Sequence, residues 1–252
     1  MKNCPIGVFD SGIGGISVLR NMRADLPCED FIYFGDDKNA PYGTRPEPEI
    51  LRLAEADADF LLKKNVKAIV IACNTATSAA AAALRGKLSI PVIGMEPALK
   101  PASLFRKDGM IAVLATSATL RQEKFCHLME RYGEYAVPVP CPGLMDYVER
   151  GVTEGAELDA FLQKVLAPFR DYRFDAAVLG CTHYVFLKDA IQKAMPGVRL
   201  FDGNEGTSHQ LRRVLSERGW LKEEGEGGVQ LFSSAENPAV IRLMERLLAT
   251  KP

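Results

Sequence analysis

The sequence predicts an α/β protein of two similar domains, each with a mainly parallel sheet flanked by helices. Apolar, β-branched runs alternate with helical patterns along almost the whole chain. The first half also resembles the second, because Ile6–Ser11 aligns with Ile111–Thr116 and pairs Ser11 with Thr116. A cysteine motif then follows at a similar distance, after 62 residues (11 to 73) and after 65 residues (116 to 181). We therefore expect duplicated βαβα units, pseudo-two-fold related, with the active site in the interdomain cleft.

Nine runs have the length and the hydrophobicity of parallel strands that are buried on both faces. They are Ile6–Phe9, Phe31–Phe34, Lys67–Ala72, Pro91–Met95, Met110–Ala115, Tyr135–Val139, Asp175–Leu179, Arg199–Phe201 and Val229–Ser233. Ten segments between and after them have a helical pattern. They are Gly15–Asp25, Pro48–Lys64, Thr75–Lys87, Pro97–Arg106, Leu120–Arg131, Met145–Arg150, Leu158–Arg170, Tyr184–Ala194, Glu205–Glu217 and Pro238–Ala249. We expect the first domain to comprise residues 1–96 and 208–252, and the second to comprise residues 97–207.

The composition is that of a globular protein, with 47% hydrophobic and 25% charged residues and a formal net charge of −1. The sequence contains no long basic run, which argues against a nucleic-acid partner and against binding to an anionic membrane surface. The first residues lack the apolar core of a signal peptide, and no apolar run approaches transmembrane length. We therefore expect a cytoplasmic protein whose six cysteines are reduced thiols.

Two short segments, Ala72–Thr75 and Gly180–His183, have the same design. Each follows an apolar run and precedes a helical stretch, so its cysteine, Cys73 or Cys181, lies at the carboxyl end of a strand. Open α/β sheets bind ligands at that end, and helix-start N–H groups stabilise a thiolate. A buried structural role for Cys73 is less favoured because the apolar run ends there. The other four cysteines are assigned to packing or to the surface: Cys4, Cys28, Cys126 and Cys141.

Further polar residues follow the first two predicted strands. The glycine-rich segment Phe9–Gly15 does not fit a dinucleotide-binding motif, because Ser17 stands where that motif needs glycine. Asp10 can therefore serve either as a helix N-cap or in the chemistry. In the loop after the second strand, a solvated turn is the favoured interpretation for Asp36 and Lys38. Tyr42 and Gly43 are better binding candidates, since they could line a cleft and offer a backbone donor.

Two opposed thiols suit racemisation at an α-carbon. One base removes a proton from one face as a thiolate, and the other returns a proton to the opposite face as a thiol. A free thiol has a pKa of about 8.5, so modest stabilisation of the thiolate prepares it for this role. The developing carbanion needs electrostatic stabilisation, for which N–H groups near Ser11, Asn74 and Thr182 are suitable donors. Cys73, Cys181 and His183 lack a fourth partner for zinc, so we predict no metal.

Five motifs together resemble the glutamate racemases of the cofactor-independent aspartate/glutamate racemase superfamily. They span most of the chain, in the family's order: FDSGIGGISVLR (Phe9–Arg20), IYFGD…APYG (Ile32–Gly43), IACNTATSAA (Ile71–Ala80), PVIGMEPA (Pro91–Ala98) and LGCTHY (Leu179–Tyr184). The resemblance implies direct interconversion of L- and D-glutamate without pyridoxal phosphate, metal or any other cofactor. It also implies a homodimer that supplies D-glutamate for peptidoglycan synthesis.

By the same resemblance, Cys73 takes the proton from D-glutamate with help from Asp10, and Cys181 acts on L-glutamate with help from His183. The residues implied to surround the substrate are Asp10, Ser11, Tyr42, Gly43, Asn74, Thr75, Thr116, Glu149, Thr182 and His183. Glu149 corresponds to an additional pocket carboxylate of the family, and Thr116 enters as the partner of Ser11.

The chain departs from the family pattern at two places. Asp37-Lys38-Asn39 stands where many members have Thr-Ala-Arg, and Val185 replaces a usual proline. The first change leaves open a racemase of aspartate or of a related acid. A decarboxylase of the superfamily is disfavoured by the presence of two cysteines. A two-lobed amino-acid binding protein would not require paired thiols.

Overall fold

The computed structural model describes residues 1–250, apart from the side chain of residue 124. The chain divides into two compact units. The first comprises residues 1–96 and 204 onward, and the second comprises residues 97–203. The predicted return to the first domain at residue 208 lies inside helix α10 (Asn204–Glu217), whose first residues already belong to the first unit.

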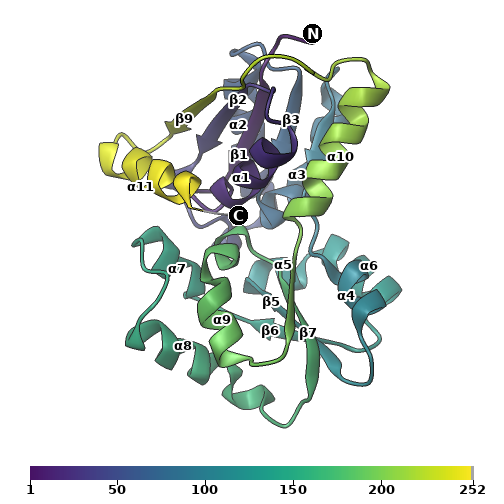
Figure 1. The fold of residues 1–252 in the computed structure, drawn as a ribbon, viewed down its shortest axis with the longest axis vertical. Helices are drawn as coiled ribbons and strands as arrows, with labels where there is room; N and C mark the ends of the chain where they lie inside the picture. The colour runs from purple at the N-terminus through teal and green to yellow at the C-terminus, as the bar shows by residue number, and fades with distance from the viewer. Residues whose placement is uncertain (251–252) are drawn as a thin grey trace. The chain divides into compact units, whose positions relative to one another are not determined.

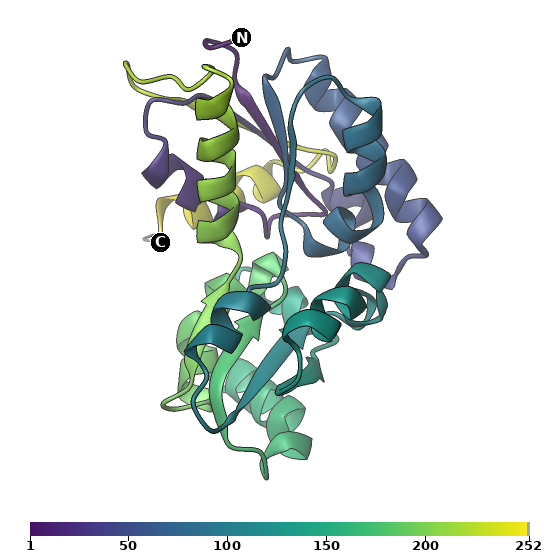
Figure 2. The ribbon, with the colours of Figure 1, turned by 90° about the vertical axis from the view of Figure 1, so that its right-hand side faces the viewer.

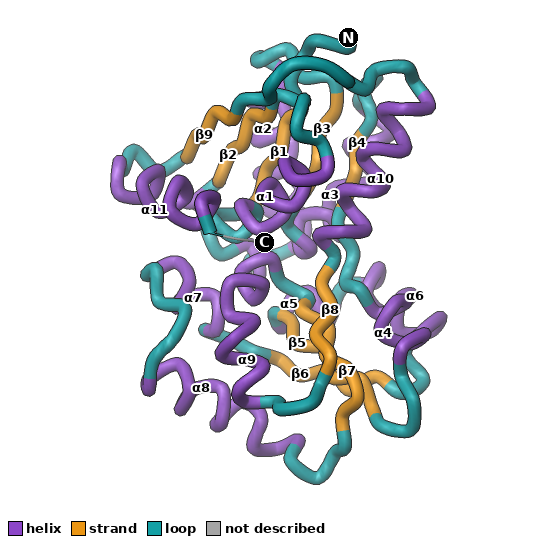
Figure 3. Tube along the Cα trace, viewed as in Figure 1, coloured by secondary structure: helices purple, strands orange, loops and turns teal. Residues whose placement is uncertain are grey.

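The first unit is built on a five-stranded sheet in the order β4-β3-β1-β2-β9, and every neighbouring pair is parallel (Figure 3). Its strands are β1 (Ile6–Asp10), β2 (Phe31–Gly35), β3 (Ala68–Ile71), β4 (Val92–Gly94) and β9 (Val229–Ser233). β1 and β3 are buried along their whole length, as expected for inner parallel strands covered on both faces. Because β9 pairs with β2, the end of the chain completes the sheet of the first unit.

Helices cover both faces of this sheet. On one face, α1 (Ile16–Asp25) packs against α10 and α11 (Pro238–Ala249), and Figures 1 and 2 show α10 running beside the strands. On the other face, α2 (Glu47–Leu62) and α3 (Asn74–Lys87) pack against each other. The core on this second face joins apolar residues of both helices to side chains from β1 and β3. The sheet is thereby shielded from water except at its ends and edges.

The second unit has a four-stranded parallel sheet in the order β6-β5-β7-β8. Its strands are β5 (Met110–Ala115), β6 (Ala136–Pro140), β7 (Phe174–Leu179) and β8 (Arg199–Asp202). Its α-helices are α4 (Leu99–Phe105), α5 (Ser117–Arg121), α6 (Glu123–Tyr132), α7 (Leu144–Glu149), α8 (Ala156–Leu166) and α9 (Lys188–Ala194). Side chains of α4 and α6 form one core with β5 and β7, and α8 packs against α9 (Figure 1).

The two sheets share one strand order. Four strands of the first unit run β4-β3-β1-β2, and those of the second run β8-β7-β5-β6. β1 therefore corresponds to β5, and β3 corresponds to β7. This correspondence follows the predicted alignment, since Ser11 comes directly after β1 and Thr116 directly after β5. Cys73 and Cys181 likewise follow corresponding strands.

Each predicted strand overlaps a strand of the structure, and two of them, Met110–Ala115 and Val229–Ser233, have the predicted bounds. Three predicted helices are divided. The prediction Leu120–Arg131 is wrong at Gln122, whose extended backbone separates α5 from α6. The predicted helix Tyr184–Ala194 begins as a 3-10 segment at Thr182, and Leu158–Arg170 ends in another, at Ala167–Phe169. Among the described residues, no helix combines the length and apolarity that a membrane span requires.

Candidate active site

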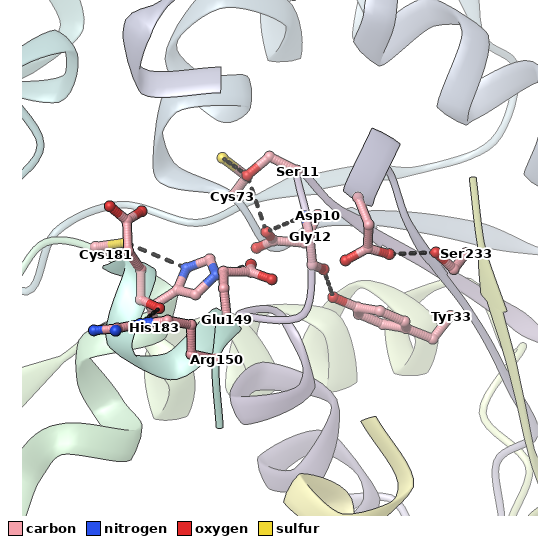
Figure 4. Close-up of polar contacts among 12 residues, drawn as sticks. Asp10, Ser11, Gly12, Tyr33, Cys73, Glu149, Arg150, Cys181, His183 and Ser233 are labelled. Carbon is pink, nitrogen blue, oxygen red and sulfur yellow. Dashed lines mark hydrogen bonds and ion pairs between the residues drawn. The ribbon is translucent and has the colours of Figure 1, made fainter. Parts of the chain in front are cut away.

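In the first unit, Asp10, Ser11 and Cys73 lie together at the carboxyl ends of β1 and β3 (Figure 4). The Ser11 hydroxyl donates to Asp10 Oδ1 over 3.3 Å, and Cys73 Sγ lies 3.7 Å from Ser11 Oγ. Asp10 is fully buried and also accepts the Gly12 N–H over 3.1 Å. The N-cap interpretation of Asp10 is wrong, because α1 begins at Ile16 and Gly15 is its N-cap. A chain of polar groups thus leads from the thiol to a buried carboxylate.

Gly15 allows the turn after β1 to close tightly over these groups. A Cβ at this position would lie 2.7 Å from Asp10 Cβ and 2.9 Å from Ala72 Cβ. The Tyr33 hydroxyl fixes the same turn by donating to the Gly12 carbonyl over 2.6 Å. Any side chain at position 15 would therefore displace either Asp10 or the segment that leads into Cys73.

Cys73 is the N-cap of α3, which begins at Asn74, one residue before the predicted helix start. Its sulfur accepts the Ala76 N–H over 3.4 Å, an interaction that favours a thiolate. Asn74 and Thr75 are buried beside it. Among the described residues, the Asn74 Oδ1 atom is buried without a hydrogen-bond partner, while its Nδ2 donates to Met95 Sδ over 3.4 Å. The residue that follows Cys73 therefore carries a buried acceptor without a partner among the described residues.

The loop after β2 is more deeply packed than predicted. Asp36 is only 3% exposed, so its assignment to a solvated turn is wrong, whereas Lys38 is exposed. The Tyr42 side chain is fully buried. Its hydroxyl oxygen lies 2.6 Å from Asp36 Oδ2 and 2.8 Å from Asp57 Oδ2. The assignment of Tyr42 and Gly43 to a cleft, with a backbone donor for the substrate, stays a prediction. Gly43 lies in the same 3-10 turn, Tyr42–Thr44.

Asp57 is a buried carboxyl that the sequence analysis did not identify. It lies on α2 and is 3% exposed. A signal was present, because Asp57 occupies a position in the apolar stripe of α2 at helical spacing. The buried residues of that stripe are Ile50, Leu53, Ala54, Asp57, Ala58 and Leu61. A charged residue within such a stripe indicates a specific polar partner in the core.

The residues that depart from the family pattern, 37 to 39, anchor this loop. The Ser233 hydroxyl at the end of β9 donates to Asp37 Oδ2 over 2.5 Å, and the Lys38 N–H donates to Ser234 Oγ over 2.9 Å. Asn39 Nδ2 lies 3.0 Å from each carboxylate oxygen of Asp36. The substituted residues therefore join the loop to β9 and donate to the Asp36 carboxyl group.

In the second unit, Cys181, His183 and Glu149 form a connected set (Figure 4). His183 Nδ1 lies 3.6 Å from Cys181 Sγ, and His183 Nε2 lies 2.7 Å from Glu149 Oε1. The structure thus brings together three residues that were proposed for the site. Glu149 comes from the last turn of α7, while Cys181 and His183 follow β7.

His183 is buried, and burial alone would disfavour its charged form. The hydrogen bonds to Cys181 and Glu149, together with the negative charge of both partners, outweigh burial and raise the pKa of His183 well above its usual value. A charged imidazole donates from both nitrogens, to Glu149 through Nε2–H and to the Cys181 sulfur through Nδ1–H. The carboxylate therefore stabilises an imidazolium that stands next to the thiol.

The surroundings of Cys181 differ from those of Cys73. Cys181 precedes the 3-10 segment Thr182–Leu187 rather than an α-helix, and its side chain accepts no capping hydrogen bond. The expectation of an α-helix directly after each cysteine segment is therefore wrong for Cys181. Thr116 caps α5, where its Oγ1 accepts the Thr119 N–H over 3.1 Å. Cys181 instead contacts the His183 imidazole, whose Nδ1 lies 3.6 Å from its sulfur.

The remaining thiols are structural or lie toward the surface. Cys141 is 1% exposed, its S–H donates to the Val139 carbonyl over 3.3 Å, and burial followed by the charge of Cys181 raises its pKa to about 12. Its assignment to packing is confirmed. Cys126 is exposed, and Cys4 and Cys28 are half-buried. Within residues 1–250, no cluster of three or more histidine, cysteine, aspartate or glutamate side chains is arranged to hold a metal ion.

Comparison with known proteins adds family evidence to this geometry. The family described as Asp/Glu/Hydantoin racemase matches residues 21–210. The chain belongs to this family. Within the Asp/Glu/hydantoin racemases, the chain is 48% identical over 256 residues to a glutamate racemase of Clostridium perfringens (strain SM101 / Type A). The alignment covers 100% of this chain and 98% of the relative.

Two solved members of the family have the same fold. Glutamate racemase from Thermus thermophilus in complex with β-chloro-D-alanine matches with a TM-score of 0.84 and 39% identity, over 98% of this chain and 93% of that one. Glutamate racemase from Francisella tularensis subsp. tularensis SCHU S4 in complex with D-glutamate matches with a TM-score of 0.86 and 32% identity. This match covers 100% of this chain and 95% of that chain. The α/β fold with two parallel sheets is therefore the fold of the racemase family.

Proposed function

We propose that this protein is a glutamate racemase that interconverts L- and D-glutamate by direct proton transfer at the α-carbon. The observation that carries the proposal is the pair of cysteines at corresponding strand ends, each with its own proton-handling partner. Cys73 is linked through Ser11 to Asp10, and Cys181 contacts His183, which is bound to Glu149. The relatives named glutamate racemase, 48% identical over the full chain, support glutamate over aspartate as substrate.

The reaction needs one thiolate and one thiol. In the direction from L- to D-glutamate, the Cys181 thiolate removes the α-proton, forming an S–H bond as the C–H bond breaks. Cys73 then donates its proton to the opposite face, so that its S–H bond breaks and the new C–H bond forms. The reverse direction exchanges the two roles. The proposal requires both thiols to reach one α-carbon from opposite faces.

The groups near each thiol suit the charges of an amino acid. The free Asn74 Oδ1 is a suitable acceptor for the substrate ammonium group. The N–H groups around Ser11, Thr75 and Thr182, and the backbone of Tyr42 and Gly43, are proposed to bind the carboxylates, with Thr116 as the counterpart of Ser11. Stabilising charge that develops on the α-carboxylate lowers the barrier to carbanion formation. No resident cofactor is part of this mechanism.

We further propose that the enzyme is a homodimer of the bacterial cytoplasm and provides D-glutamate for peptidoglycan. These features are typical of the glutamate racemases that the motifs resemble. Light scattering during size-exclusion chromatography measures the oligomeric state directly, and a mass of twice 27.6 kDa is expected.

Racemisation in deuterium oxide tests the two-base mechanism. L-Glutamate incubated with the enzyme should lose its circular dichroism, and at early times deuterium should appear in D-glutamate but not in the remaining L-glutamate. That distribution follows because the proton returned to the second face comes from a base that has exchanged with solvent. Mass spectrometry of the separated enantiomers measures it. Early deuterium in both enantiomers would contradict two separate bases.

Substitution of the thiols assigns the roles. Cys73→Ser and Cys181→Ser should each lower kcat by at least about a hundredfold, the typical scale for loss of a general acid or base. Cys126→Ser is the matched control, because Cys126 is an exposed thiol on α6. Near-normal turnover in either Cys73→Ser or Cys181→Ser would overturn the assignment, and faster racemisation of aspartate than of glutamate would overturn the substrate.

A further inference from the structure

Asp36, Tyr42 and Asp57 form a buried row of three acidic groups in the first unit. The Tyr42 hydroxyl oxygen lies between the two carboxylates, 2.6 Å from Asp36 Oδ2 and 2.8 Å from Asp57 Oδ2. All three residues are at most 3% exposed. These residues come from the loop after β2, the turn Tyr42–Thr44 and helix α2, so the row joins three separate segments.

Counting protons shows that one of the carboxyl groups is protonated. Two oxygen atoms approach to 2.6–2.8 Å only when a proton lies between them. The row has two such contacts, but the Tyr42 hydroxyl supplies one proton. Burial, as the largest cause, raises the pKa of Tyr42 above its usual value, so this hydroxyl keeps its proton. The second proton must therefore be carried by Asp36 or by Asp57.

The surroundings place that proton on Asp57. Asn39 Nδ2 lies 3.0 Å from both oxygens of Asp36, and this donor stabilises a carboxylate there. Asp57 lies in the apolar stripe of α2, between Leu53 and Leu61. Burial, followed by the charge of Asp36, raises the pKa of Asp57 to about 8. Asp57 thus donates to the Tyr42 oxygen, and Tyr42 donates to Asp36.

We propose that Asp57 is a positioning residue of the glutamate site. Through the proton that it donates to Tyr42, Asp57 holds the turn containing Tyr42 and Gly43 against the loop that contains Asp36. The turn belongs to the candidate substrate-binding residues, so this role rests on the proposed function. Asp57 itself contacts no reacting atom. It acts through Tyr42, whose hydroxyl is held from both sides and cannot rotate away.

Loss of the proton would weaken the row in a defined pH range. The charged groups on the elements packed against α2 are Asp10 at the end of β1, Asp36 after β2, and Arg85 and Lys87 on α3. Arg85 donates to the Val92 carbonyl, and Lys87 pairs with the half-buried Glu55. Asp10 and Asp36 both disfavour a charge on Asp57. Ionised Asp57 therefore loses its hydrogen bond to Tyr42 and adds a second negative charge beside Asp36.

The pH dependence of the stability of the protein tests, without any substrate, whether Asp57 is protonated in the folded state. The folded state holds a proton on Asp57 that the unfolded state releases near the ordinary aspartate pKa of 3.8, so the stabilisation is present at low pH and is lost as the pH rises toward about 8. Asp57→Asn keeps a donor to Tyr42 and does not titrate. Its urea midpoint should exceed that of the wild type increasingly from pH 5 to pH 9. Asp59→Asn, on the exposed side of α2, is the matched control and should show no such trend.

The positioning role is tested with glutamate. Between pH 7 and pH 9 the KM of the wild type should rise about tenfold more than that of Asp57→Asn, because only about a tenth of Asp57 remains protonated one unit above its pKa. Asp57→Ala, which provides no donor, should have a raised KM at every pH. Equal KM profiles for the wild type and Asp57→Asn would overturn the positioning role. Equal pH dependence of the urea midpoints of the wild type and Asp57→Asn would show that Asp57 carries no proton in the folded state. A wild type without racemisation would refute only the proposed function.

Discussion

Two thiols of one chemical type have different proton partners. Cys73 accepts a backbone N–H at the start of α3 and reaches Asp10 through Ser11, whereas Cys181 contacts the imidazole of His183. A sulfur at a helix start and a sulfur beside an imidazole have different electrostatic surroundings, so the two should respond differently to mutation of their neighbours. This difference gives each direction of the proposed racemisation its own supporting residues.

Glu149 should control the protonation of His183. Glu149→Gln removes the charge that lies 2.7 Å from His183 Nε2, so the pKa of His183 should fall and the imidazole should be neutral at a lower pH. The glutamine oxygen can still accept from His183 Nε2–H, but a hydrogen bond to a charged group is worth about 1.5–3 kcal/mol and one to a neutral group about 0.5–1.5 kcal/mol. Loss of the charge therefore corresponds to about a tenfold decrease in kcat for L-glutamate. Proton-detected ¹⁵N spectra of His183 across pH 5–9 measure the first effect. An unchanged His183 titration would contradict this role.

The raised pKa of His183 also makes the stability of the folded state depend on pH. A histidine whose pKa is raised in the folded state stabilises that state fully below about pH 6.5, and the stabilisation is lost as the pH rises through the folded-state value. Glu149→Gln should therefore be less stable than the wild type at pH 6, and the difference should shrink at alkaline pH.

Sequence reasoning reached the site residues to different degrees. Cys73 and Cys181 could be predicted because parallel strands place their last residues at one edge of a sheet. Asp36 was misassigned, since a polar loop after a strand usually faces water and its partners, Asn39 and Tyr42, are recognisable only in three dimensions. Glu149 entered through family resemblance alone, because no local pattern relates the end of α7 to a histidine 34 residues further on.

At the scale of elements, the turns after the strands determine where the functional side chains lie. β1 and β5 correspond, as do β3 and β7, yet their following turns differ. After β3 an α-helix begins at Asn74, while after β7 the chain continues as a 3-10 segment from Thr182. Residue pattern alone predicts helix in both places, since 3-10 and α segments have similar side-chain spacing over one turn. This similarity explains why the predicted helix Tyr184–Ala194 was only partly correct.

The position of Cys181 depends on a glycine at position 180, where the chain leaves β7 and passes close to β5. A Cβ at position 180 would lie 2.8 Å from Ala115 Cβ and 3.0 Å from the Leu114 carbonyl oxygen, so β5 leaves no room for a side chain. Gly180→Ala should lower the free energy of unfolding by about 1–3 kcal/mol through overpacking. It should also lower kcat by displacing Cys181. Urea denaturation followed by circular dichroism measures the stability.

Gly206→Ala is the matched control for this substitution. Gly206 lies in α10 and is exposed, and a Cβ at this position would meet open space. Alanine favours a helix over glycine by up to about 1 kcal/mol, so this change should be neutral or stabilising. Equal loss of stability in both variants would mean that crowding against β5 is not the cause.

At the scale of the whole molecule, the last part of the chain belongs to the first unit. β9 completes the sheet beside β2, and α10 packs against α1. The strand order shared by the two units agrees with a duplicated βαβα unit, to which the first unit adds β9. The duplication could be predicted because the repeated motifs have similar spacing. The pairing of β9 with β2 could not, because neither strand carries a local signal that selects its partner.

A buried ion pair fastens the returning segment to the first unit. Lys67 Nζ lies 2.5 Å from Glu29 Oε2, and both side chains are at most 1% exposed. The same ammonium donates to the carbonyls of Lys2 and Trp220, over 2.8 and 2.9 Å, and the Lys222 N–H donates to Glu29 Oε1 over 2.7 Å. One pair of charges therefore holds the chain start, β3 and the returning segment together.

Removal of Lys67 should unfold the first unit more readily. Lys67→Met leaves Glu29 buried with its charge uncompensated, which typically costs about 3–5 kcal/mol, whereas Lys67→Met with Glu29→Gln removes both charges and should recover part of that loss. Trp220, the single tryptophan, lies in the returning segment, so its fluorescence during urea denaturation reports on this unit. Lys87→Met breaks the more exposed pair with Glu55 and should cost at most about 1 kcal/mol. If Lys67→Met cost no more than Lys87→Met, the buried pair would not be what fastens the returning segment.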